Sequence, residues 1–457
     1  MSHFGVLSYK GTGHLNPLIA LSRQLMLRGH RVTFFQAPQL ETRVRQCGLE
    51  FYPIRTDKPS SRKHGEIDSL KSPKSGIAGL RERMRRIVGD MEMSLREMPT
   101  ALTQAGVDAL IIDEIVLSGP TLAEMLHLPY FLVSTSVPHR FGWAVPRQLS
   151  YLSQLQNTFL QVSVFHIRGP IRWKLDNYRR QVGLGPIREV QKVFPELAHI
   201  TQLPQCLDFT HMILPANFHY AGPFTDVAAR LSVEFPWDRL DGRPLIYASL
   251  GTRKNSQRAI FSFIAEVCQD LDLQLVISLG GRLDPETFDG LPGRPLVVRD
   301  APQLELLKKA EVVITHGGVN TVLETLLEGK PMIVIPMAHD QPAVAVRLAW
   351  LNVAEVLSAR RLSTKQLRLV LVNLLENPSY RDAARELQAR IRSARGLERA
   401  VEVIEEALEK HAIGHGTSSK GSESGVEGAH RHQSAGNIAH SVSKSQVRQG
   451  DTRMTGD

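Results

Sequence analysis

Cysteine is scarce in this sequence, with three in 457 residues. Cys47, Cys206 and Cys268 are widely spaced and form no CxxC motif. An odd, scattered set of this kind indicates neither a disulfide framework nor a zinc site built on cysteine. We therefore expect reduced thiols.

Long apolar runs are absent as well. No uninterrupted stretch reaches the length of about 18 residues that a membrane-spanning helix requires. The first residues, MSHFGVLSYKGTGHLNP, place an apolar run of strand length directly before a glycine-rich turn. They lack the charged n-region and the small-residue cleavage site of a signal peptide. These absences predict a cytoplasmic protein that does not cross a membrane.

Motifs of nucleic-acid recognition are also missing. The formal net charge is +9, but the basic residues are spread along the chain, and no zinc-finger or RNP pattern occurs. We expect no nucleic-acid partner. The surplus charge leaves two interpretations open: a solvated surface, or attraction to anionic phosphate groups on a ligand or on a lipid surface, with peripheral contact at the inner face of a membrane.

The length and composition predict two globular domains and a tail. Hydrophobic residues make up 42% of the chain and charged residues 22%, and 457 residues suit two domains of about 200 residues each. We predict a first domain over 1–215, a linker over 216–242, and a second domain with C-terminal helices over 243–410. From 411 to 457 the composition shifts to Ser, Gly, His and charged residues, which predicts a disordered tail.

Strand and helix patterns alternate in both halves of the chain. The first half begins with HFGVLSY, NPLIALSRQLMLRGH, RVTFFQ and LEFYPI, and we expect Asn16 to cap the first helix with Pro17 in its first turn. The second half repeats the alternation with LIYASL, LQLVISLG, PLVVRD, VVIT and PMIVIP, whereas 141–209 is expected to be helical and irregular. The predicted fold is α/β: two Rossmann-like, doubly wound parallel-sheet domains that face each other across a cleft.

The stretch THGGVNTVLETLLEGKPMIVIPMAHDQP predicts a ligand site in the second domain. The strand VVIT leads into two glycines and then a helix whose first N–H groups have no partner within the helix, so a diphosphate can bind there, with His316 as a further donor. Asn320 and Glu324 are four residues apart and share one helix face, where a carboxylate can accept from two ribose hydroxyls. Asp340 and Gln341 follow the next strand at the same sheet edge and could bind the hydroxyls of a sugar.

A second constellation is predicted in the first domain. In a sheet of order 3-2-1-4, strands one and four are neighbours, so His14 after strand one and Asp113 at the end of strand four should meet at one crevice. An imidazole supported by a carboxylate can act as a general base. Each residue also has a purely structural interpretation, His14 in a glycine-flanked loop and Asp113 as a helix cap.

From about Ser2 to about Lys410 the chain resembles the UDP-glycosyltransferase superfamily of the GT-B fold, and HGGVNTVLETL with GKPMIVIPMAHDQP is similar to its donor-binding signature. Within the superfamily it is most similar to the zeaxanthin glucosyltransferases of carotenoid biosynthesis, through MSHF, RGHRVTF and THGGVNTVLE with DQPAVAVRL. The resemblance implies an inverting, metal-independent hexosyltransferase with no cofactor, since the UDP-sugar is a co-substrate. Its implied partners are a UDP-sugar and an apolar, hydroxylated acceptor such as zeaxanthin.

The same resemblance implies roles for individual residues. His14 would be the base and Asp113 its partner. The diphosphate would lie against Ser249, Thr252, His316, Gly318, Asn320 and Thr321; the nucleoside against Gln303 and Glu324; and the transferred hexose against Asp340 and Gln341. One departure is Asp300, because many members carry an aromatic residue there on which the base stacks.

The acceptor is the least determined part of this interpretation. An enzyme that acts on lipid-dissolved alcohols should present apolar and cationic surface near its acceptor site. Candidates for such a surface are Phe141, Trp143, Arg168, Arg172, Trp173 and Lys174. The plainer interpretation is that the aromatics are core and the charges are solvated. Macrolides, flavonoids, sterols and other lipid alcohols remain alternative acceptors.

Other classes of protein fit the sequence less well. GTGHLN begins like the dinucleotide motif GxGxxG but lacks its third glycine, and Gln36 stands where an acid for the ribose is expected, which disfavours a nicotinamide or flavin enzyme. A sugar-nucleotide epimerase would not need His14 and Asp113 arranged for an incoming alcohol. A non-catalytic partner of a glycosyltransferase stays open as a remote alternative. The DLD at Asp270 to Asp272 is interpreted as a solvated turn and not as a metal motif.

Overall fold

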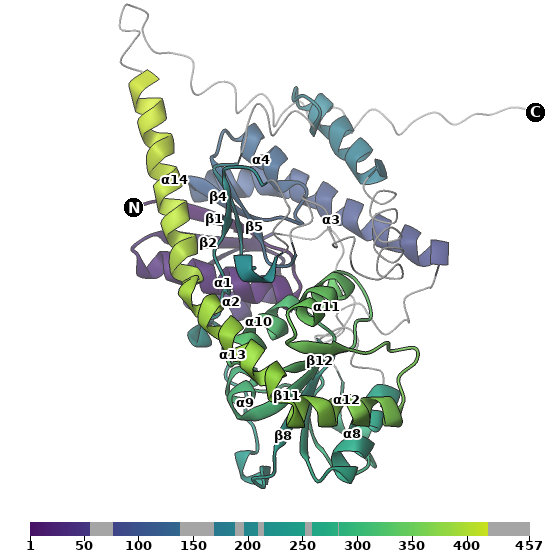
Figure 1. Cartoon of the computed structure of the whole chain (residues 1–457). Coiled ribbons are helices and arrows are strands. Elements are labelled where there is room, and N and C mark those ends of the chain that lie inside the picture. Colours follow the sequence, from purple (N-terminus) through teal and green to yellow (C-terminus); the bar gives the residue numbers. More distant parts are fainter. Residues whose placement is uncertain are drawn as a thin grey trace, which may run out of the picture.

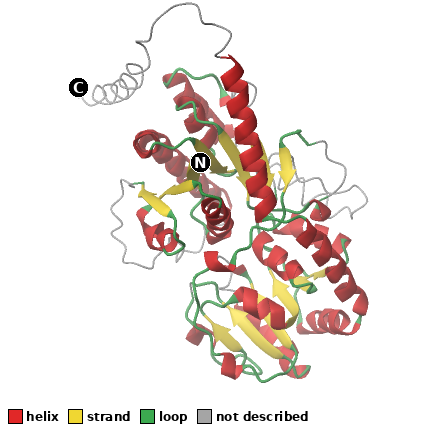
Figure 2. Cartoon of the chain, turned by 90° about the vertical axis from the view of Figure 1, so that its left-hand side faces the viewer, coloured by secondary structure: helices red, strands yellow, loops and turns green. Residues whose placement is uncertain are grey.

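The structure is a computed structural model that describes residues 1–54, 76–137, 169–187, 196–208, 214–251, 258–281 and 283–418. Figure 1 shows two domains, one above the other, each built around its own sheet. Both sheets are entirely parallel, and each is covered by helices (Figure 2). The predicted fold class, two doubly wound α/β domains, is confirmed.

The first sheet has seven strands in the order β3-β2-β1-β4-β5-β6-β7. The central strand β1 pairs with β2 on one side and with β4 on the other, so the predicted neighbourhood of strands one and four is confirmed. The strand bounds are β1 His3–Leu7, β2 Arg31–Gln36, β3 Glu50–Pro53, β4 Ala109–Asp113, β5 Tyr130–Ser134, β6 Ala198–Thr201 and β7 Phe218–Tyr220.

Helices connect these strands on both faces of the sheet. They are α1 Thr12–Leu27, α2 Glu41–Arg45, α3 Gly76–Ala105, α4 Gly119–Met125 and a further helix over 169–181, with 3-10 turns η1 Pro38–Leu40, η2 Gln205–Leu207, η3 Val227–Ala229 and η4 Trp237–Arg239. The predicted start of the first helix was wrong. Its N-cap is Gly11, so Asn16 and Pro17 are buried inside the helix, and His14 lies in its first turn instead of in a loop.

The second sheet repeats the order of the first, β10-β9-β8-β11-β12-β13. Its strands are β8 Leu245–Ser249, β9 Gln274–Ser278, β10 Leu296–Val298, β11 Ala310–Thr315, β12 Met332–Val334 and β13 Ala354–Val356. Its helices are α8 Arg258–Asp270, α9 Gln303–Lys309, α10 Val319–Leu327, α11 Gln341–Trp350, α12 Thr364–Glu376 and α13 Pro378–Ser393, with the 3-10 turn η5 Pro285–Phe288. The strand β11 is buried and central, which places the turn after it at the carboxyl edge of the sheet.

The last helix, α14 Leu397–Ser418, leaves the second domain and packs against α1 and β6 of the first (Figure 1). Ala400, Val401, Val403 and Ile404 are buried in the same core as strands of the first sheet. The helix also continues past 411, where the tail was predicted to begin, and 419–457 lie outside the described residues. The C-terminus of the described chain therefore stabilises the first domain.

The two domains are packed together by a buried seam. Val137, Leu203 and Leu207 of the first domain lie in one apolar cluster with residues of α10 and α11. Beside them Arg347 of α11 donates to the carboxylate of Asp208 at 3.0 Å, and both side chains are buried. A buried pair of this kind fixes the orientation of the groups that it joins, since each charge is costly without the other.

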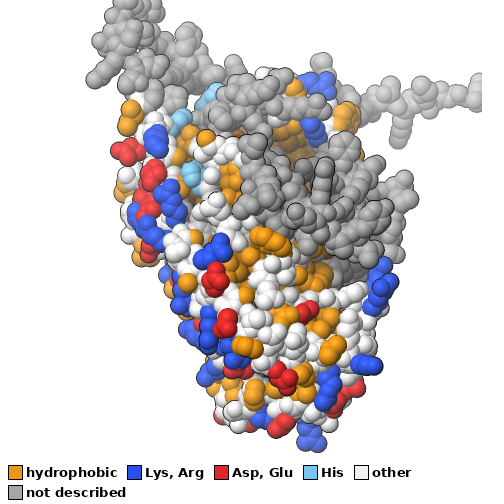
Figure 3. Space-filling view, in the orientation of Figure 1, with side chains coloured by type: hydrophobic (Ala, Val, Ile, Leu, Met, Phe, Trp, Pro, Cys, Tyr) orange, Lys and Arg blue, Asp and Glu red, His pale blue; other side chains and the backbone are white. Residues whose placement is uncertain are grey.

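Charge on the surface is mixed. Along the edge formed by the C-terminal helices, Lys and Arg alternate with Asp and Glu (Figure 3). Arg395 and Arg399, for example, both pair with Glu402. This alternation supports the interpretation of the basic residues there as a solvated surface. Among the helices of the described residues, none has the length and hydropathy needed to span a membrane.

Candidate active site

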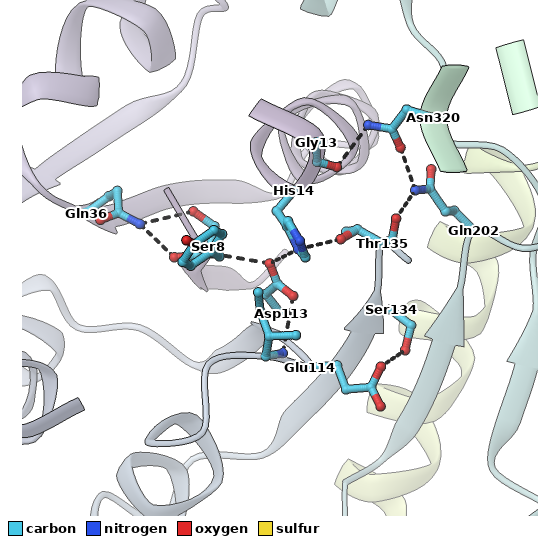
Figure 4. A network of polar contacts seen from close by, with 12 residues as sticks. Ser8, Gly13, His14, Gln36, Asp113, Glu114, Ser134, Thr135, Gln202 and Asn320 are labelled. Carbon is cyan, nitrogen blue, oxygen red and sulfur yellow. Dashed lines mark hydrogen bonds and ion pairs between the residues drawn. The ribbon is translucent and has the colours of Figure 1, made fainter. Parts of the chain in front are cut away.

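The predicted contact between His14 and Asp113 is present. Nδ1 of His14 lies 2.9 Å from Oδ2 of Asp113 (Figure 4). The carboxylate is 1% exposed and the imidazole 21% exposed. Asp113 ends β4 and His14 begins α1 after the neighbouring strand β1, so the sheet order brings together residues that are far apart in sequence.

Main-chain groups hold the Asp113 carboxylate in place. The N–H of Tyr9 donates to Oδ2 and the N–H of Ile115 donates to Oδ1, each at 3.3 Å. An ionised carboxylate only accepts hydrogen bonds, so the imidazole proton resides on Nδ1 and Nε2 carries none. An imidazole in this tautomer can remove a proton through Nε2, and the adjacent carboxylate then stabilises the imidazolium.

A third residue, Thr135, was missed by the sequence reasoning. It follows β5, and its Oγ1 lies 2.7 Å from Nδ1 of His14. The signal that could have found it is its position: β5 neighbours β4, so the residue after β5 lies at the same carboxyl edge of the sheet as Asp113. The orientation of the His14 ring is therefore set by two side chains instead of one.

The predicted diphosphate site has the expected backbone. Gly317 has φ +86°, a conformation that favours glycine, and Gly318 is the N-cap of α10. The first N–H groups of α10 thus point out of the helix end, where they and the helix dipole favour an anion. His316 lies directly before this turn, as predicted.

The ring of His316 packs between two glycines. A Cβ on Gly251 would come 2.5 Å from its Cε1, and a Cβ on Gly318 would come 2.8 Å from it. Burial lowers the pKa of His316 to about 4, a hydrogen bond with the backbone of Ser249 opposes this shift, and the nearby His339 adds to it. The ring is therefore neutral at physiological pH, and its single N–H is the donor in the hydrogen bond with the backbone of Ser249.

Three further residues were predicted beside this ring. Ser249 ends β8 and is buried, and its Oγ accepts from the N–H of Gly251 at 3.5 Å. Thr252 lies outside the described residues. Thr321 is half-buried in the first turn of α10, and its carbonyl accepts from the hydroxyl of Thr325 at 2.6 Å.

The two residues predicted to bind the nucleoside are in contact. The amide of Gln303 donates to Glu324, which is buried, and Tyr247 donates to the other end of the Gln303 amide at 3.1 Å. Arg230, from the linker before β8, pairs with the same carboxylate and was not predicted. Burial raises the pKa of Glu324, although Arg230 and Gln303 both oppose that shift. Nothing in the spacing of the sequence could have indicated Arg230.

The two residues predicted to bind the sugar flank the start of α11. Asp340 is half-buried and directly precedes the helix. Gln341 is buried, and its Oε1 accepts from the N–H groups of Met337 and Ala338, both at 2.8 Å. The carbonyl end of Gln341 thus shapes its own loop.

The two candidate sites are joined by a direct contact. Asn320 in the first turn of α10 donates from Nδ2 to the carbonyl of Gly13 at 2.9 Å (Figure 4). Gly13 directly precedes His14 in the chain, and Asn320 is two residues beyond Gly318. The imidazole of the first domain and the N-terminus of α10 in the second domain are therefore neighbours in space.

The candidate acceptor residues are placed only in part. Phe141, Trp143 and Arg168 lie outside the described residues. Trp173 is 63% exposed, so it is not a core residue. Its neighbours are paired, Arg172 with Asp176 at 3.5 Å and Lys174 with Glu92 at 2.6 Å. These ion pairs reduce the cationic character that the sequence led us to expect here.

The DLD segment forms the predicted turn between α8 and β9. Asp272 pairs with Arg243 at 3.0 Å, and Asp270 pairs with Arg368 at 3.2 Å. All four side chains are well exposed. In the described ranges no group of three or more His, Cys, Asp or Glu residues is placed to hold a metal ion.

Two doubly wound domains with their sites in contact define a class of protein. The solved structure of the glycosyltransferase of kitacinnamycin shares the fold with a TM-score of 0.71 at 24% identity, covering 89% of this chain and 98% of that one. The calicheamicin glycosyltransferase CalG4 gives a TM-score of 0.70 at 23% identity, covering 90% and 99%. The architecture is that of the GT-B glycosyltransferases.

The sequence comparison places the chain in a family. The family described as "UDP-glucoronosyl and UDP-glucosyl transferase" matches residues 69–412, and the chain belongs to it. It is 28% identical over 422 residues to the zeaxanthin glucosyltransferase of Pantoea ananas, which covers 89% of this chain and 96% of that relative. It is 25% identical over 411 residues to the NDP-glycosyltransferase YjiC of Bacillus subtilis, covering 90% and 98%. The chain is a glycosyltransferase.

Proposed function

We propose that this glycosyltransferase moves a hexose, glucose, from a UDP-sugar to a hydroxyl of an apolar acceptor, a hydroxylated carotenoid such as zeaxanthin, with inversion at the anomeric carbon. The observation that carries the chemical part is the contact of His14 with Asp113 beside the N-terminus of α10. A base and an anion site must be close if an alcohol is to attack a sugar whose leaving group is a diphosphate.

The proposed reaction is a single displacement. Nε2 of His14 removes the proton of the acceptor hydroxyl while that oxygen attacks the anomeric carbon, and Asp113 stabilises the imidazolium that forms. The bond from the anomeric carbon to the diphosphate oxygen breaks, and UDP leaves with its electron pair. The N–H groups at the start of α10 then stabilise the new charge, with the neutral ring of His316 packed beside them, which is why we propose a reaction that needs no metal ion.

The proposed donor is supported by family membership and by the contact of Gln303 with Glu324. The neighbour VinC was solved in complex with DTDP, a pyrimidine nucleotide. Asp300 departs from the aromatic residue expected at this point, and burial raises the pKa of its carboxyl. We propose that the base lies beside Asp300 and is held by its edge more than by stacking.

The proposed acceptor is supported by the relatives alone. Two of them are zeaxanthin glucosyltransferases, from Pantoea ananas and from Pseudescherichia vulneris, at 28% and 27% identity. Others act on different aglycones by their names, among them demethyllactenocin mycarosyltransferase at 23% identity. Macrolides, flavonoids, sterols and other lipid alcohols are therefore the alternative acceptors, and the exposed Trp173 is the residue we would place near such a molecule.

The test is a donor and acceptor screen. The purified protein is incubated with UDP-glucose and zeaxanthin in detergent micelles, with a chelator, and the products are analysed by mass spectrometry. We expect mono- and diglucosides of zeaxanthin at equal rates with and without the chelator. Macrolide, flavonoid and sterol acceptors are tested in parallel, and a preference for one of them would replace the carotenoid part of the proposal.

A non-catalytic partner of a glycosyltransferase is the remaining candidate. Such a protein could retain the fold but would not cleave a sugar nucleotide. Release of UDP from UDP-glucose, measured with and without each acceptor, separates the two cases. No release with any acceptor would contradict the proposal that this chain carries out transfer by itself.

A further inference from the structure

We propose that Gln202 is a positioning residue for the transfer reaction: it fixes Thr135 against the catalytic imidazole and, at the same time, fixes Asn320 of the other domain. This inference rests on the proposed role of His14 as the base. Gln202 follows β6, in a segment of the sequence that shows no site motif. It is not among the predicted site residues.

The Gln202 side chain bridges the two domains from a buried position. It is 2% exposed, and its Nε2 donates both to the main-chain carbonyl of Thr135 and to Oδ1 of Asn320, the latter at 2.8 Å (Figure 4). Both protons of one amide nitrogen are thus used, one in each domain. A buried amide whose donors are satisfied in this way has little freedom to rotate.

The orientation of both amides follows from the ends of the chain of hydrogen bonds. The carbonyls of Thr135 and Gly13 can only accept, so Gln202 must present Nε2 to Thr135, and Asn320 must present Nδ2 to Gly13. Asn320 then has only Oδ1 left, which faces the second proton of Gln202. Turning either amide over would place acceptor against acceptor.

The same contacts close a ring around the proposed base. Thr135 is held through its carbonyl by Gln202, and its hydroxyl lies 2.7 Å from Nδ1 of His14. On the other side Asn320 holds the carbonyl of Gly13, the residue before His14. In addition to its contact with Asp113, His14 is thus restrained at its ring by Thr135 and through Gly13 by Asn320, and Gln202 holds both Thr135 and Asn320.

This arrangement has a consequence for catalysis. General-base catalysis depends on the direction in which Nε2 points, because the proton is transferred over a short hydrogen bond to a hydroxyl that must also be aligned for attack. Without Gln202 the second domain still carries the anion-binding helix end, but the imidazole loses a fixed relation to it. The expected defect is in the rate of transfer and not in the binding of the nucleotide.

The test compares two buried glutamines. Gln202→Met fills a similar volume without a donor. Gln274→Met is the matched control, because Gln274 is 7% exposed, lies in β9, and bridges the carbonyl of Arg239 and the N–H of Asp241 away from the site. We expect kcat to fall at least tenfold for Gln202→Met, with the Kd for UDP within about threefold of wild type, whereas Gln274→Met keeps kcat within about twofold.

A second variant keeps the test decisive if Gln202→Met does not fold. Gln202→Glu retains the shape of the side chain but places a carboxylate oxygen against the carbonyl of Thr135 and Oδ1 of Asn320. We expect its loss of kcat to be at least as large as that of Gln202→Met. A second readout comes from Thr135→Val: if both residues act through His14, the double variant with Gln202→Met should lose less than the product of the two single losses.

The outcomes separate this inference from the proposed function. No transfer by the wild-type protein would contradict the proposed function. Transfer by the wild type together with an undiminished kcat in Gln202→Met would overturn only the positioning role. Equal loss of kcat and of UDP affinity, or multiplicative effects with Thr135→Val, would make Gln202 a structural residue and would also overturn it.

Discussion

At the scale of single residues, the neutral ring of His316 occupies space that two glycines leave open. Gly251 has φ +76°, and a methyl group there would overlap the ring. We expect Gly251→Ala to displace His316 and to weaken UDP binding at least tenfold, measured by isothermal titration calorimetry. The displaced ring would no longer fill the space beside the helix end where the diphosphate is proposed to bind.

A second glycine provides a control that distinguishes the effect of backbone strain from the effect of the clash with His316. Gly290 has φ +77°, nearly the same conformation, and a Cβ there would meet nothing within 4 Å. Gly290→Ala should therefore show a similar loss of stability from the positive φ, of about 1 kcal/mol, with UDP affinity unchanged. Equal affinities for the two variants would contradict the role assigned to the His316 ring.

The lowered pKa of His316 predicts a pH dependence of stability. Its pKa of about 4 in the folded protein lies below the ordinary value of 6.5. As pH falls from 6.5 towards 4, the unfolded chain takes up a proton that the folded chain does not, so stability is lost by at most about 1.4 kcal/mol per pH unit in this window. Above 6.5 this contribution is constant.

Chemical denaturation at pH 6.5 and pH 5 checks this sign. Between pH 6.5 and pH 5 the free energy of unfolding of the wild type should fall by about 1 to 2 kcal/mol more than that of His316→Gln, in which residue 316 cannot titrate. A wild type and a variant with the same pH dependence would mean that the ring is not buried as the structure places it. The comparison of the two proteins cancels the other titrating groups.

The sequence predicted the chemistry-bearing residues but not their supports. His14 is in contact with Asp113, as the sheet order implied, and Gln303 is in contact with Glu324, which the family resemblance assigned to the same nucleoside. Thr135, Gln202 and Arg230 were missed. Thr135 could have been found from its position after β5, whereas Gln202 and Arg230 carry no pattern of their own, because their role comes from neighbours that are close only after folding.

At the scale of elements, strands with a strong hydrophobic pattern were predicted, and strands with a weak pattern were missed. The long apolar strands around both sheet centres were found, whereas the short strands β6, β7 and β13 were missed; β7 and β13 are edge strands, and β6 is next to β7. AHIT and FHY are only four and three residues long and each is interrupted by a histidine, so they are too short to show a hydrophobic period. A strand this short can be identified only from its pairing in the folded sheet.

The start of α1 shows why a local rule failed. Asn16 followed by Pro17 is a good N-terminal signal, yet the helix begins at Thr12. Pro17 is the sixth residue of the helix, so its missing N–H leaves the carbonyl of Gly13 without its helical donor, and Asn320 donates to that carbonyl instead. Asn16 is buried, and Arg43 donates to its Oδ1. The earlier start is what places His14 on a helix.

The helix α14 leads to a prediction about stability. Ile404 is fully buried in the core of the first domain, whereas Ile413 on the same helix is 60% exposed. We expect Ile404→Ala to lower the free energy of unfolding by about 2–4 kcal/mol, because it removes buried methylenes and leaves a cavity. Ile413→Ala should change it by less than about 0.5 kcal/mol.

Hydrogen exchange locates this effect. Amides of α1 and β6 should exchange faster in Ile404→Ala, since α14 covers them, and amides of β9 in the second domain should not change. Faster exchange confined to the second domain would contradict the packing of α14 on the first. The domain boundaries predicted from the sequence could not include this crossing, because the helix pattern gives a buried face but not the surface that buries it.

At the scale of the whole molecule, the repeated sheet order follows from one physical rule. Alternating strands and helices with short connections wind outward from a central strand, and the carboxyl ends of the central strands then define the ligand side. This rule allowed the sites in both domains to be predicted before their contact was known. The contact itself, from Asn320 to Gly13 and along the buried seam, depends on how the domains pack and has no counterpart in the sequence pattern.

The central claim is that the two domains divide the reaction, with the base in the first and the nucleotide site in the second. The most direct measurement is the transfer rate and the UDP affinity of His14→Ala under the conditions that give wild-type turnover. We expect the rate to fall by a factor of about 10² to 10⁴, the usual contribution of a general base, with the Kd for UDP within about twofold of wild type. Retained turnover, or a parallel loss of UDP binding, would contradict this division.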